Sequence, residues 1–370
     1  MDKKLHIVSF SVPFPANYGG VIDVFYKLKS LYEAGVKVVL HCFQYDREPA
    51  EELDFFCEQV FYYPRKMKGA HLLGFYPFIV GSRSSEKLME NLLKDDAPIL
   101  FEGLHTCLPV LDNRLKDRKK LVRSHNVEHN YYLALAKLER NPMKRLYYKT
   151  EARKLERFEP LAFNNADVVL GISKKDTIYL NGKYENAIHV SAFHGFEVVN
   201  IPEKTEDFSL YHGNLSVGEN NQAALFLAGD VFKGLKHKLI IAGNNPSVQL
   251  QKLVGQLSNV ELKDDLSSGE INDLIHRAKI NILPTFQSTG IKLKLLAALF
   301  NGGHCLVNDK MVQDTGLEGA VHIANSVKEF KEKVSELSLN SIVDNDVKTR
   351  KEILYNFRND FNVKKLKGVI

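Results

Sequence analysis

A carboxylate and an imidazole lie close together in the segment Glu102-Gly103-Leu104-His105. The segment follows residues 97–101 (APILF), a short apolar run typical of a buried β-strand. Glu and His are side chains that commonly transfer protons in enzymes. Glu102 and His105 are therefore predicted to be an acid–base pair or polar ligand contacts at the end of that strand. A purely structural histidine is the alternative.

A second polar cluster, Arg123 to His129 (RSHNVEH), follows the strand-like run at residues 120–123. Arg123 and His125 are suited to binding a phosphate or a sugar hydroxyl, which makes a ligand-facing cluster one interpretation. The letters HNVEH also fit H-x-x-E-H, in which two histidines one helical turn apart bind zinc. Because a strand precedes His125, we expect it in a turn rather than on a helix. A zinc site made of His125, Glu128 and His129 is therefore the weaker alternative.

Two glycine-containing turns precede predicted helices and could hold an anion. Gly19 and Gly20 follow PFPANY, and their spacing does not match the dinucleotide-binding fingerprint G-x-G-x-x-G. In PTFQSTGIKLK, Ser288, Thr289 and Gly290 begin a helix whose first turns carry Lys292 and Lys294. Positive side chains oppose the helix dipole at an N-terminus, so the two lysines indicate an anion bound nearby. Tight turns, capping hydroxyls and solvated lysines are the alternatives.

Two further segments could contact ligands or surfaces. HGNLSVGENN, residues 212–221, follows a predicted strand, and its Asn214, Glu219 and Asn220 could line a binding loop or cap the next helix. Residues 65–83 have basic ends and an apolar middle. This pattern is typical of a segment at a membrane interface, or of a buried helix with basic flanks.

The elements that position these residues alternate between strands and helices. The run of residues 5–12 is followed by a glycine turn, a helical pattern and a second strand at 36–43, which is a βαβ unit. The same alternation begins again at 208–212, after a polar linker at 202–207, and helices dominate after about residue 325. The sequence predicts an α/β protein of two doubly wound parallel-sheet halves. Ligands of such sheets bind at the carboxyl ends of the strands, and we expect the site in a cleft between the halves.

Composition restricts the class of protein. The chain has 370 residues, 44% hydrophobic and 26% charged, as expected of a globular protein with two domains. Lys and Arg number 50 against 45 Asp and Glu, an excess too small to indicate a nucleic-acid partner. The four cysteines form no C-x-x-C motif, which fits a reducing compartment. The first residues resemble a strand rather than a secretory signal, and no run is long enough to span a bilayer.

Together these motifs resemble the glycosyltransferases of the GT-B fold, in particular the family 4-like group of retaining enzymes. The most specific segments are YHGNLSVGENNQAALFL and PTFQSTGIKLKLLAALFNGGHCLVN, and the resemblance spans most of the chain. It implies two Rossmann-like domains facing a cleft. Residues 1–200 would hold the acceptor, residues 201–352 would hold the nucleotide-sugar donor, and a C-terminal helix at 353–370 would cross back to the first domain.

The resemblance also implies roles for individual residues. The two glutamates of the family motif correspond to Thr289 and Ala297 here, so both carboxylates are missing. The usual diphosphate-binding Arg and Lys are also not evident. Lys292 and Lys294 would replace the missing positive charge, and Glu318 a contact to the ribose. The other expected donor contacts are Gly19, Gly20, Asn214, Glu219, Asn220, Ser288, Thr289 and Gly290. The catalytic candidates are His105, His125 and Glu102, and Arg123, Asn126 and Glu128 are expected on the acceptor side.

The expected function is transfer of a sugar, with retention of configuration, from a nucleotide sugar to a saccharide or lipid-linked acceptor. We expect no metal ion, no cofactor and no nucleic acid. The expected location is the cytoplasm, with peripheral contact to the inner face of the membrane. The missing carboxylates leave a second class open, a non-catalytic relative that acts as a binding or assembly partner.

Overall fold

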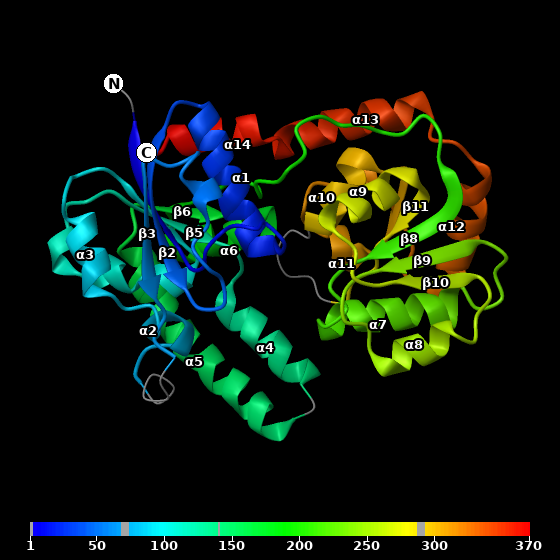
Figure 1. The fold of residues 1–370 in the computed structure, drawn as a ribbon, viewed down its shortest axis with the longest axis horizontal. Coiled ribbons are helices and arrows are strands. Elements are labelled where there is room, and N and C mark those ends of the chain that lie inside the picture. The colour runs from blue at the N-terminus through cyan, green and yellow to red at the C-terminus, as the bar shows by residue number, and fades with distance from the viewer. Residues whose placement is uncertain (1–2, 68–73, 140, 287–292) are drawn as a thin grey trace. The chain divides into compact units, whose positions relative to one another are not determined.

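The computed structural model describes residues 3–67, 74–139, 141–286 and 293–370. The chain forms two compact units, and each has its own parallel sheet (Figure 1). The first unit contains residues 1–195 and 359–370, and the second contains residues 196–358. These divisions lie a few residues from the boundaries at 200 and 352 that the sequence suggests.

The described part of the first unit contains a seven-stranded sheet in the order β3-β2-β1-β4-β5-β6-β7, with every neighbouring pair parallel. Its strands are β1 (Lys4–Ser9), β2 (Lys37–Gln44), β3 (Gln59–Pro64), β4 (Ile99–Glu102), β5 (Lys120–Ser124), β6 (Val168–Gly171) and β7 (Ala187–His189). The edge strand β3 is not predicted above, because it is half-exposed and lacks a continuous apolar run.

Helices cover both faces of the first sheet. They are α1 (Gly19–Glu33), α2 (Phe78–Gly81), α3 (Glu86–Leu92), α4 (Glu128–Leu138), α5 (Pro142–Asn164), α6 (Lys174–Tyr184) and α14 (Asn359–Lys367). Ile7 of β1 packs in one apolar cluster with side chains of α1 and α14, and the next residue, Val8, packs in the other cluster with α3 and α5. Because neighbouring side chains on a strand point to opposite faces, the continuous apolar runs are buried on both sides.

The helix pattern between residues 130 and 163 is divided into α4 and α5. The Asn141 side chain accepts hydrogen bonds from the amides of Met143 and Lys144, at 2.9 and 3.2 Å, which caps the start of α5. Pro142 occupies the first helical position, where its missing N–H costs nothing. The cap and the proline together begin a new helix.

The described part of the second unit contains a six-stranded parallel sheet in the order β10-β9-β8-β11-β12-β13. Its strands are β8 (Glu206–His212), β9 (Lys238–Ala242), β10 (Val260–Lys263), β11 (Ala278–Ile282), β12 (His304–Val307) and β13 (His322–Ile323). Its helices are α7 (Gly218–Phe226), α8 (Val248–Val254), α9 (Ser268–Arg277), α10 (Leu293–Asn301), α11 (Asp309–Val312), α12 (Val327–Leu339) and α13 (Asp344–Leu354).

The last helix, α14, belongs to the first unit although it follows the second in sequence. The Asn362 side chain accepts a hydrogen bond from the Ser191 amide at 3.1 Å, and the Lys3 ammonium donates to the Ile370 carbonyl at 2.9 Å. The two ends of the chain are therefore joined within one unit.

The strand order reverses once in each sheet, between β1 and β4 in the first and between β8 and β11 in the second. Connections from the two strands at such a point leave in opposite directions, which opens a crevice at their carboxyl ends. The loops after β1, β4, β8 and β11 are therefore where ligand contacts are expected.

Candidate functional site

A buried charged cluster lies where β4 and β5 end, against α1. The Lys27 ammonium donates to Glu102 at 2.5 Å and to Asp23 at 2.9 Å. Arg123 also binds Asp23, with its Nη2 2.9 Å from Oδ1, and His125 Nε2 lies 3.0 Å from the second oxygen of Glu102. Asp23, Lys27, Glu102 and Arg123 are fully buried, whereas the side chain of His125 is 11% exposed. His125 is therefore the member of this cluster that can reach a ligand.

The two carboxylates of the cluster are held ionised. Burial alone would raise the pKa of Asp23, but the charges of Arg123, Lys27 and His125 outweigh it and hold the pKa well below its usual range. Burial likewise opposes ionisation of Glu102, and Lys27 and His125 lower its pKa. Glu102 is thus a charged partner that fixes the orientation of the His125 ring.

The zinc interpretation of HNVEH is wrong. His125 precedes α4, whereas His129 lies on it, and the two rings contact different carboxylates. His129 Nδ1 lies 3.0 Å from Glu159, far in sequence from Glu102. Among the described residues, the group with metal-like spacing is Asp23, Glu102 and His125, and its carboxylates already bind an ammonium and a guanidinium.

His105 lies beside this cluster, across the ring of Phe10. The Phe10 ring lies 5.4 Å from the His105 ring and 5.6 Å from that of His125. Burial and nearby positive charges lower the pKa of His105 well below its usual range, and its Nδ1 has no hydrogen-bond partner among the described residues. Gly20 makes this packing possible, because an added Cβ would lie 2.6 Å from Cζ of Phe10.

The residues expected on the acceptor side are placed less favourably. Arg123 is fully buried and also donates to the carbonyls of Val190 and Ser191, so its contacts give it a structural role. Glu128 is buried at the start of α4, and burial raises its pKa to about 8. Asn126 is half-buried, and its carbonyl accepts a hydrogen bond from the Ser124 hydroxyl at 2.9 Å.

Lys294 is a cation at the strand reversal of the second sheet. It lies in the first turn of α10, and its ammonium lies 3.0 Å from Oδ1 of Asn220 and 3.4 Å from the Tyr211 hydroxyl. The ammonium also lies 5.0 Å from the centre of the Tyr211 ring. His212, at the end of β8, is buried, and burial followed by the Lys294 charge lowers its pKa to about 3. The structure therefore brings Lys294 and Asn220 together at the end of β8.

Glu219 joins this group through the loop that follows β11. Its carboxylate accepts a hydrogen bond from the Thr285 hydroxyl, and Thr285 is fixed in turn by two backbone hydrogen bonds with the Asn308 side chain. Asn214 is exposed, and its side-chain oxygen accepts from the amide and the hydroxyl of Ser216. Glu318 accepts from the Thr315 amide at 3.1 Å, so its carboxylate is bound within its own turn.

Four of the proposed donor contacts cannot be placed. Ser288, Thr289, Gly290 and Lys292 lie outside the described residues. Gly19 is the first residue of α1 and is exposed, and no side chain caps this helix end among the described residues.

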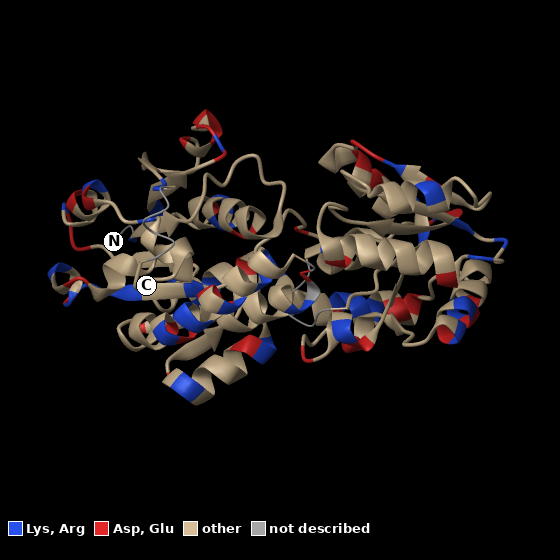
Figure 2. Ribbon diagram, turned by 90° about the horizontal axis from the view of Figure 1, so that it is seen from below, with Lys and Arg blue, Asp and Glu red and all other residues tan. Residues whose placement is uncertain are grey.

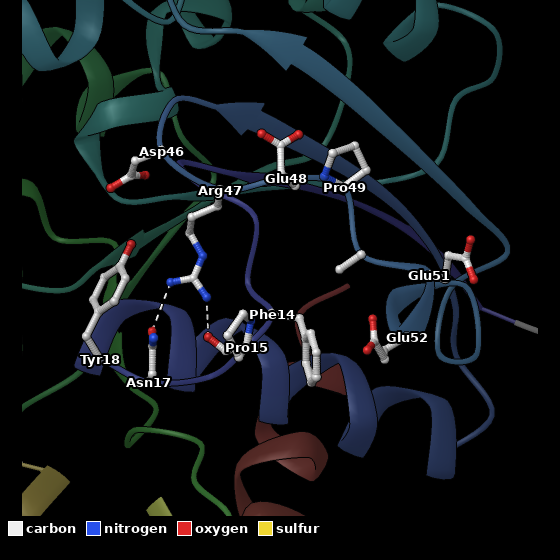
Figure 3. Close-up of a pocket in the computed structure, with 11 residues that line it drawn as sticks. Phe14, Pro15, Asn17, Tyr18, Asp46, Arg47, Glu48, Pro49, Glu51 and Glu52 are labelled. Atoms are coloured by element: carbon white, nitrogen blue, oxygen red, sulfur yellow. Dashed lines mark hydrogen bonds between the residues drawn. The ribbon is translucent and has the colours of Figure 1, made fainter. Parts of the chain in front are cut away.

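A cavity of about 1030 Å³ opens beside the start of α1 in the first unit (Figure 3). Arg47 crosses it and donates to the Asn17 side chain at 2.9 Å and to the Pro15 carbonyl. Its lining combines aromatic rings with carboxylates: Phe14, Pro15, Asn17, Tyr18, Asp46, Arg47, Glu48, Pro49, Ala50, Glu51 and Glu52. Carboxylates accept hydrogen bonds from hydroxyl groups and amides can also donate them, so the cavity is suited to a polar, hydroxyl-rich ligand.

Sequence reasoning missed Asp23 and Lys27, which complete the charged cluster. A signal was present, because the two charges are four residues apart and share the apolar face of α1 with Val24, Leu28 and Leu31. An ion pair on a face that should be buried indicates a buried partner from another element.

Comparisons with known proteins agree with this architecture. No family model matches the chain. A protein of Klebsiella pneumoniae described as an uncharacterized 44.6 kDa protein in cps region is 27% identical over 321 residues, which cover 80% of this chain and 81% of that one. The structure of a mutant of S. aureus TarM with Fondaparinux, alpha-GlcNAc-glycerol and UDP is 11% identical, with a TM-score of 0.67 and 99% of both chains covered. The lipopolysaccharide outer core galactosyltransferase WaaB is 12% identical, with a TM-score of 0.64 over 99% of this chain and 98% of the other.

These likenesses and the two parallel sheets define the fold as the GT-B fold of glycosyltransferases. No helix within the described ranges combines the length and the apolar composition needed to cross a bilayer.

Proposed function

We propose that the protein is a glycosyltransferase that moves a sugar from a nucleotide sugar to a saccharide or lipid-linked acceptor. The observation that carries the proposal is the placement of polar groups at both strand reversals. His105, His125 and Glu102 lie where β4 and β5 end, and Lys294 and Asn220 lie beside the end of β8. These are the positions where doubly wound sheets bind their ligands.

The second unit would hold the donor. The Lys294 ammonium supplies positive charge next to the N-terminus of α7, where amides favour an anion such as a diphosphate. In the S. aureus TarM structure with this fold, UDP is among the bound molecules. Glu318, on the exposed turn before β13, is the proposed contact to the ribose hydroxyls.

The first unit would hold the acceptor. The cavity beside α1 offers carboxylates for hydroxyl groups and the ring of Tyr18 for stacking (Figure 3). Arg47 lies 5.4 Å from the centre of that ring and fixes the loop after β2. A saccharide end of the acceptor fits this combination of groups.

The chemical step would depend on charge stabilisation and on His125. The acceptor oxygen forms the new bond to the sugar while the bond from the sugar to the diphosphate breaks, and the imidazole, held by the ionised Glu102, can accept the proton that the acceptor hydroxyl loses. We propose transfer with retention of configuration and without a metal ion, because ammonium and amide groups can stabilise the leaving diphosphate. Proton NMR of the product tests retention. An inverted anomeric centre would contradict retention.

The biological role would be the assembly of a cell-envelope polysaccharide. The Klebsiella pneumoniae relative described as lying in a cps region supports this role. We propose that the protein works in the cytoplasm, at the inner face of the membrane.

The apolar residues Phe78 to Val80 of the segment 65–83 are buried, as in the alternative of a buried helix with basic flanks, so membrane contact would instead be made by the hairpin of α4 and α5. Leu133, Met143 and Leu146 are 42%, 80% and 66% exposed there. Lys144 and Lys149 on α5 are exposed as well, and Figure 2 shows basic residues interspersed with acidic ones along the helices. Apolar side chains with basic neighbours favour an anionic lipid surface. Met143→Glu with Leu146→Glu should reduce co-sedimentation with phosphatidylglycerol vesicles, whereas the control Ile178→Glu, also at an exposed apolar position, should not.

A screen of UDP-, GDP-, ADP- and CMP-sugars tests the function itself. We expect one class to raise the melting temperature and to be slowly hydrolysed in the absence of acceptor. Binding without any turnover would instead indicate a non-catalytic relative. No binding of any nucleotide sugar would refute the proposal.

A further inference from the structure

The segment between β3 and α3 places two arginines near the carboxyl edge of the first sheet. Arg65 directly follows β3 and Arg83 follows α2. Arg83 is only 6% exposed, and its guanidinium donates to the Phe10 carbonyl at 2.9 Å and to the Ile79 carbonyl at 2.7 Å. Phe10 is the residue whose ring separates His105 from His125. Arg83 is thus anchored at the proposed reaction edge.

Neither arginine has a carboxylate partner among the described residues. Arg65 donates to the Ser82 hydroxyl at 3.0 Å and lies 5.0 Å from the Tyr45 ring and 5.3 Å from the Phe78 ring. The sequence has no acidic residue from position 64 to position 85. The two guanidinium groups therefore lie close enough to repel each other, and the carboxylate whose charge acts on both is Asp46, which forms no ion pair with either among the described residues.

Glu151 is an acidic side chain that reaches this segment, and it is already bound to other groups. Glu151 of α5 accepts from the Phe78 amide at 2.5 Å and pairs with Lys154 at 3.0 Å. A buried charge is normally paired, because an unpaired one loses its hydration without compensation. A guanidinium has five N–H groups that can donate hydrogen bonds. Nε and Nη1 of Arg83 have acceptors, but no described residue accepts a hydrogen bond from its Nη2.

The two charges act on the neighbouring groups. After burial itself, the charges of Arg83, His125 and Arg65 contribute to the lowered pKa of His105. Burial and the charge of Arg65 lower the pKa of Arg83 to about 9, so Arg83 remains protonated at neutral pH. An anion bound here would offset the part of each shift that comes from the neighbouring positive charges.

We propose that Arg65 and Arg83 bind a phosphate or diphosphate group of the acceptor. The proposal rests on the proposed function in naming the acceptor as the source of that group. A guanidinium can bind two phosphate oxygens through parallel hydrogen bonds, which makes arginine better suited than lysine to such a site. Arg65 would bind in this way through Nη1 and Nη2, and Arg83 would add a hydrogen bond from Nη2. The cavity beside α1 would then hold the saccharide and the two arginines the phosphate that carries it.

Calorimetric titration of inorganic pyrophosphate tests the site. We expect Arg83→Gln and Arg65→Gln each to weaken pyrophosphate binding at least tenfold, and Arg153→Gln, at an exposed position of α5, to leave it unchanged. Titration of Lys294→Ala shows how much of the pyrophosphate binding comes from the second unit. Arg65 is only partly buried, so its variant keeps the test valid if Arg83→Gln fails to fold. Unchanged pyrophosphate affinity in a folded Arg65→Gln variant would overturn the proposal.

Two further titrations identify the source of the phosphate. Tighter binding of geranyl diphosphate than of pyrophosphate supports a lipid-linked acceptor, and tighter binding of glucose 1-phosphate supports a soluble one. Weaker binding of geranyl diphosphate or glucose 1-phosphate to Arg65→Gln and Arg83→Gln than to the wild type supports the phosphate site. If the protein binds no nucleotide sugar but still binds pyrophosphate through Arg65 and Arg83, the proposed function is contradicted and the phosphate site is not.

Discussion

Replacing Lys27 with methionine should destabilise the first unit strongly. The Lys27 ammonium is fully buried and bridges Asp23 and Glu102. Asp23 would keep Arg123 and the Phe193 amide, at 2.9 and 2.8 Å, whereas Glu102 would keep only its contact with the His125 ring among the described side chains. The cost is therefore dominated by one poorly compensated carboxylate, for which breaking a buried pair costs about 3–5 kcal/mol.

The loss of stability caused by Lys27→Met should increase as the pH rises. In the wild type the pKa of Glu102 is lowered, so its contribution to stability is present above its unfolded pKa and disappears as pH falls through the folded value. Without Lys27 the buried carboxyl should have a raised pKa and become neutral in mild acid. The difference between wild type and Lys27→Met should consequently be largest near pH 8 and smaller near pH 5.

Thermal unfolding followed by circular dichroism measures this effect. For a unit of this size, about 3–5 kcal/mol corresponds to a decrease of roughly 10 °C in the melting temperature. Lys87→Met is the control, because Lys87 is 68% exposed and forms a surface pair with Glu90, so we expect a change below about 0.5 kcal/mol. A Lys27→Met protein that melts within about 2 °C of the wild type at pH 8, roughly a change below 1 kcal/mol, would refute the reasoning.

Two further predictions concern His125 and Gly20. His125→Gln should lower kcat for sugar transfer by about 10²–10⁴, the range for loss of a proton-transfer group, while leaving the donor KM unchanged; equal kcat values would remove His125 from the chemistry. Gly20→Ala should lower the melting temperature and the activity, because its Cβ would displace Phe10 from the two histidine rings at an expected cost of about 1–3 kcal/mol. A Gly20→Ala protein with wild-type melting and turnover would show that this packing is unnecessary.

The fold could be predicted because parallel strands buried on both faces leave continuous apolar runs in the sequence. LHIVS of β1 and KLIIA of β9 are runs of this kind, and turn residues separate them from the helices. The strand β13 was not predicted, because two residues cannot show a periodic pattern. The half-exposed β3 was missed because only the pairing with β2 identifies it as a strand.

The candidate site could be predicted in part. Glu102 and His125 stand out because Glu102 ends one apolar strand and His125 directly follows another, and their contact follows from the parallel pairing of β4 with β5. The role of Lys27 depends on which face of α1 packs against the sheet. The sequence of α1 alone does not show which residue of another element pairs with a charged side chain on that face. The structural role of Arg123 could not be predicted for the same reason, because its partners, Asp23 and two backbone carbonyls, are distant in sequence.

The central claim, that the end of the second sheet binds the diphosphate of a nucleotide sugar, is tested most directly by one binding measurement. Calorimetry should compare the wild type, Lys294→Ala and Lys310→Ala, an exposed position on α11 of the same unit, with the nucleotide sugar that gives the largest thermal shift. We predict at least tenfold weaker binding for Lys294→Ala and an unchanged affinity for Lys310→Ala. Equal affinities in all three proteins would contradict the claim.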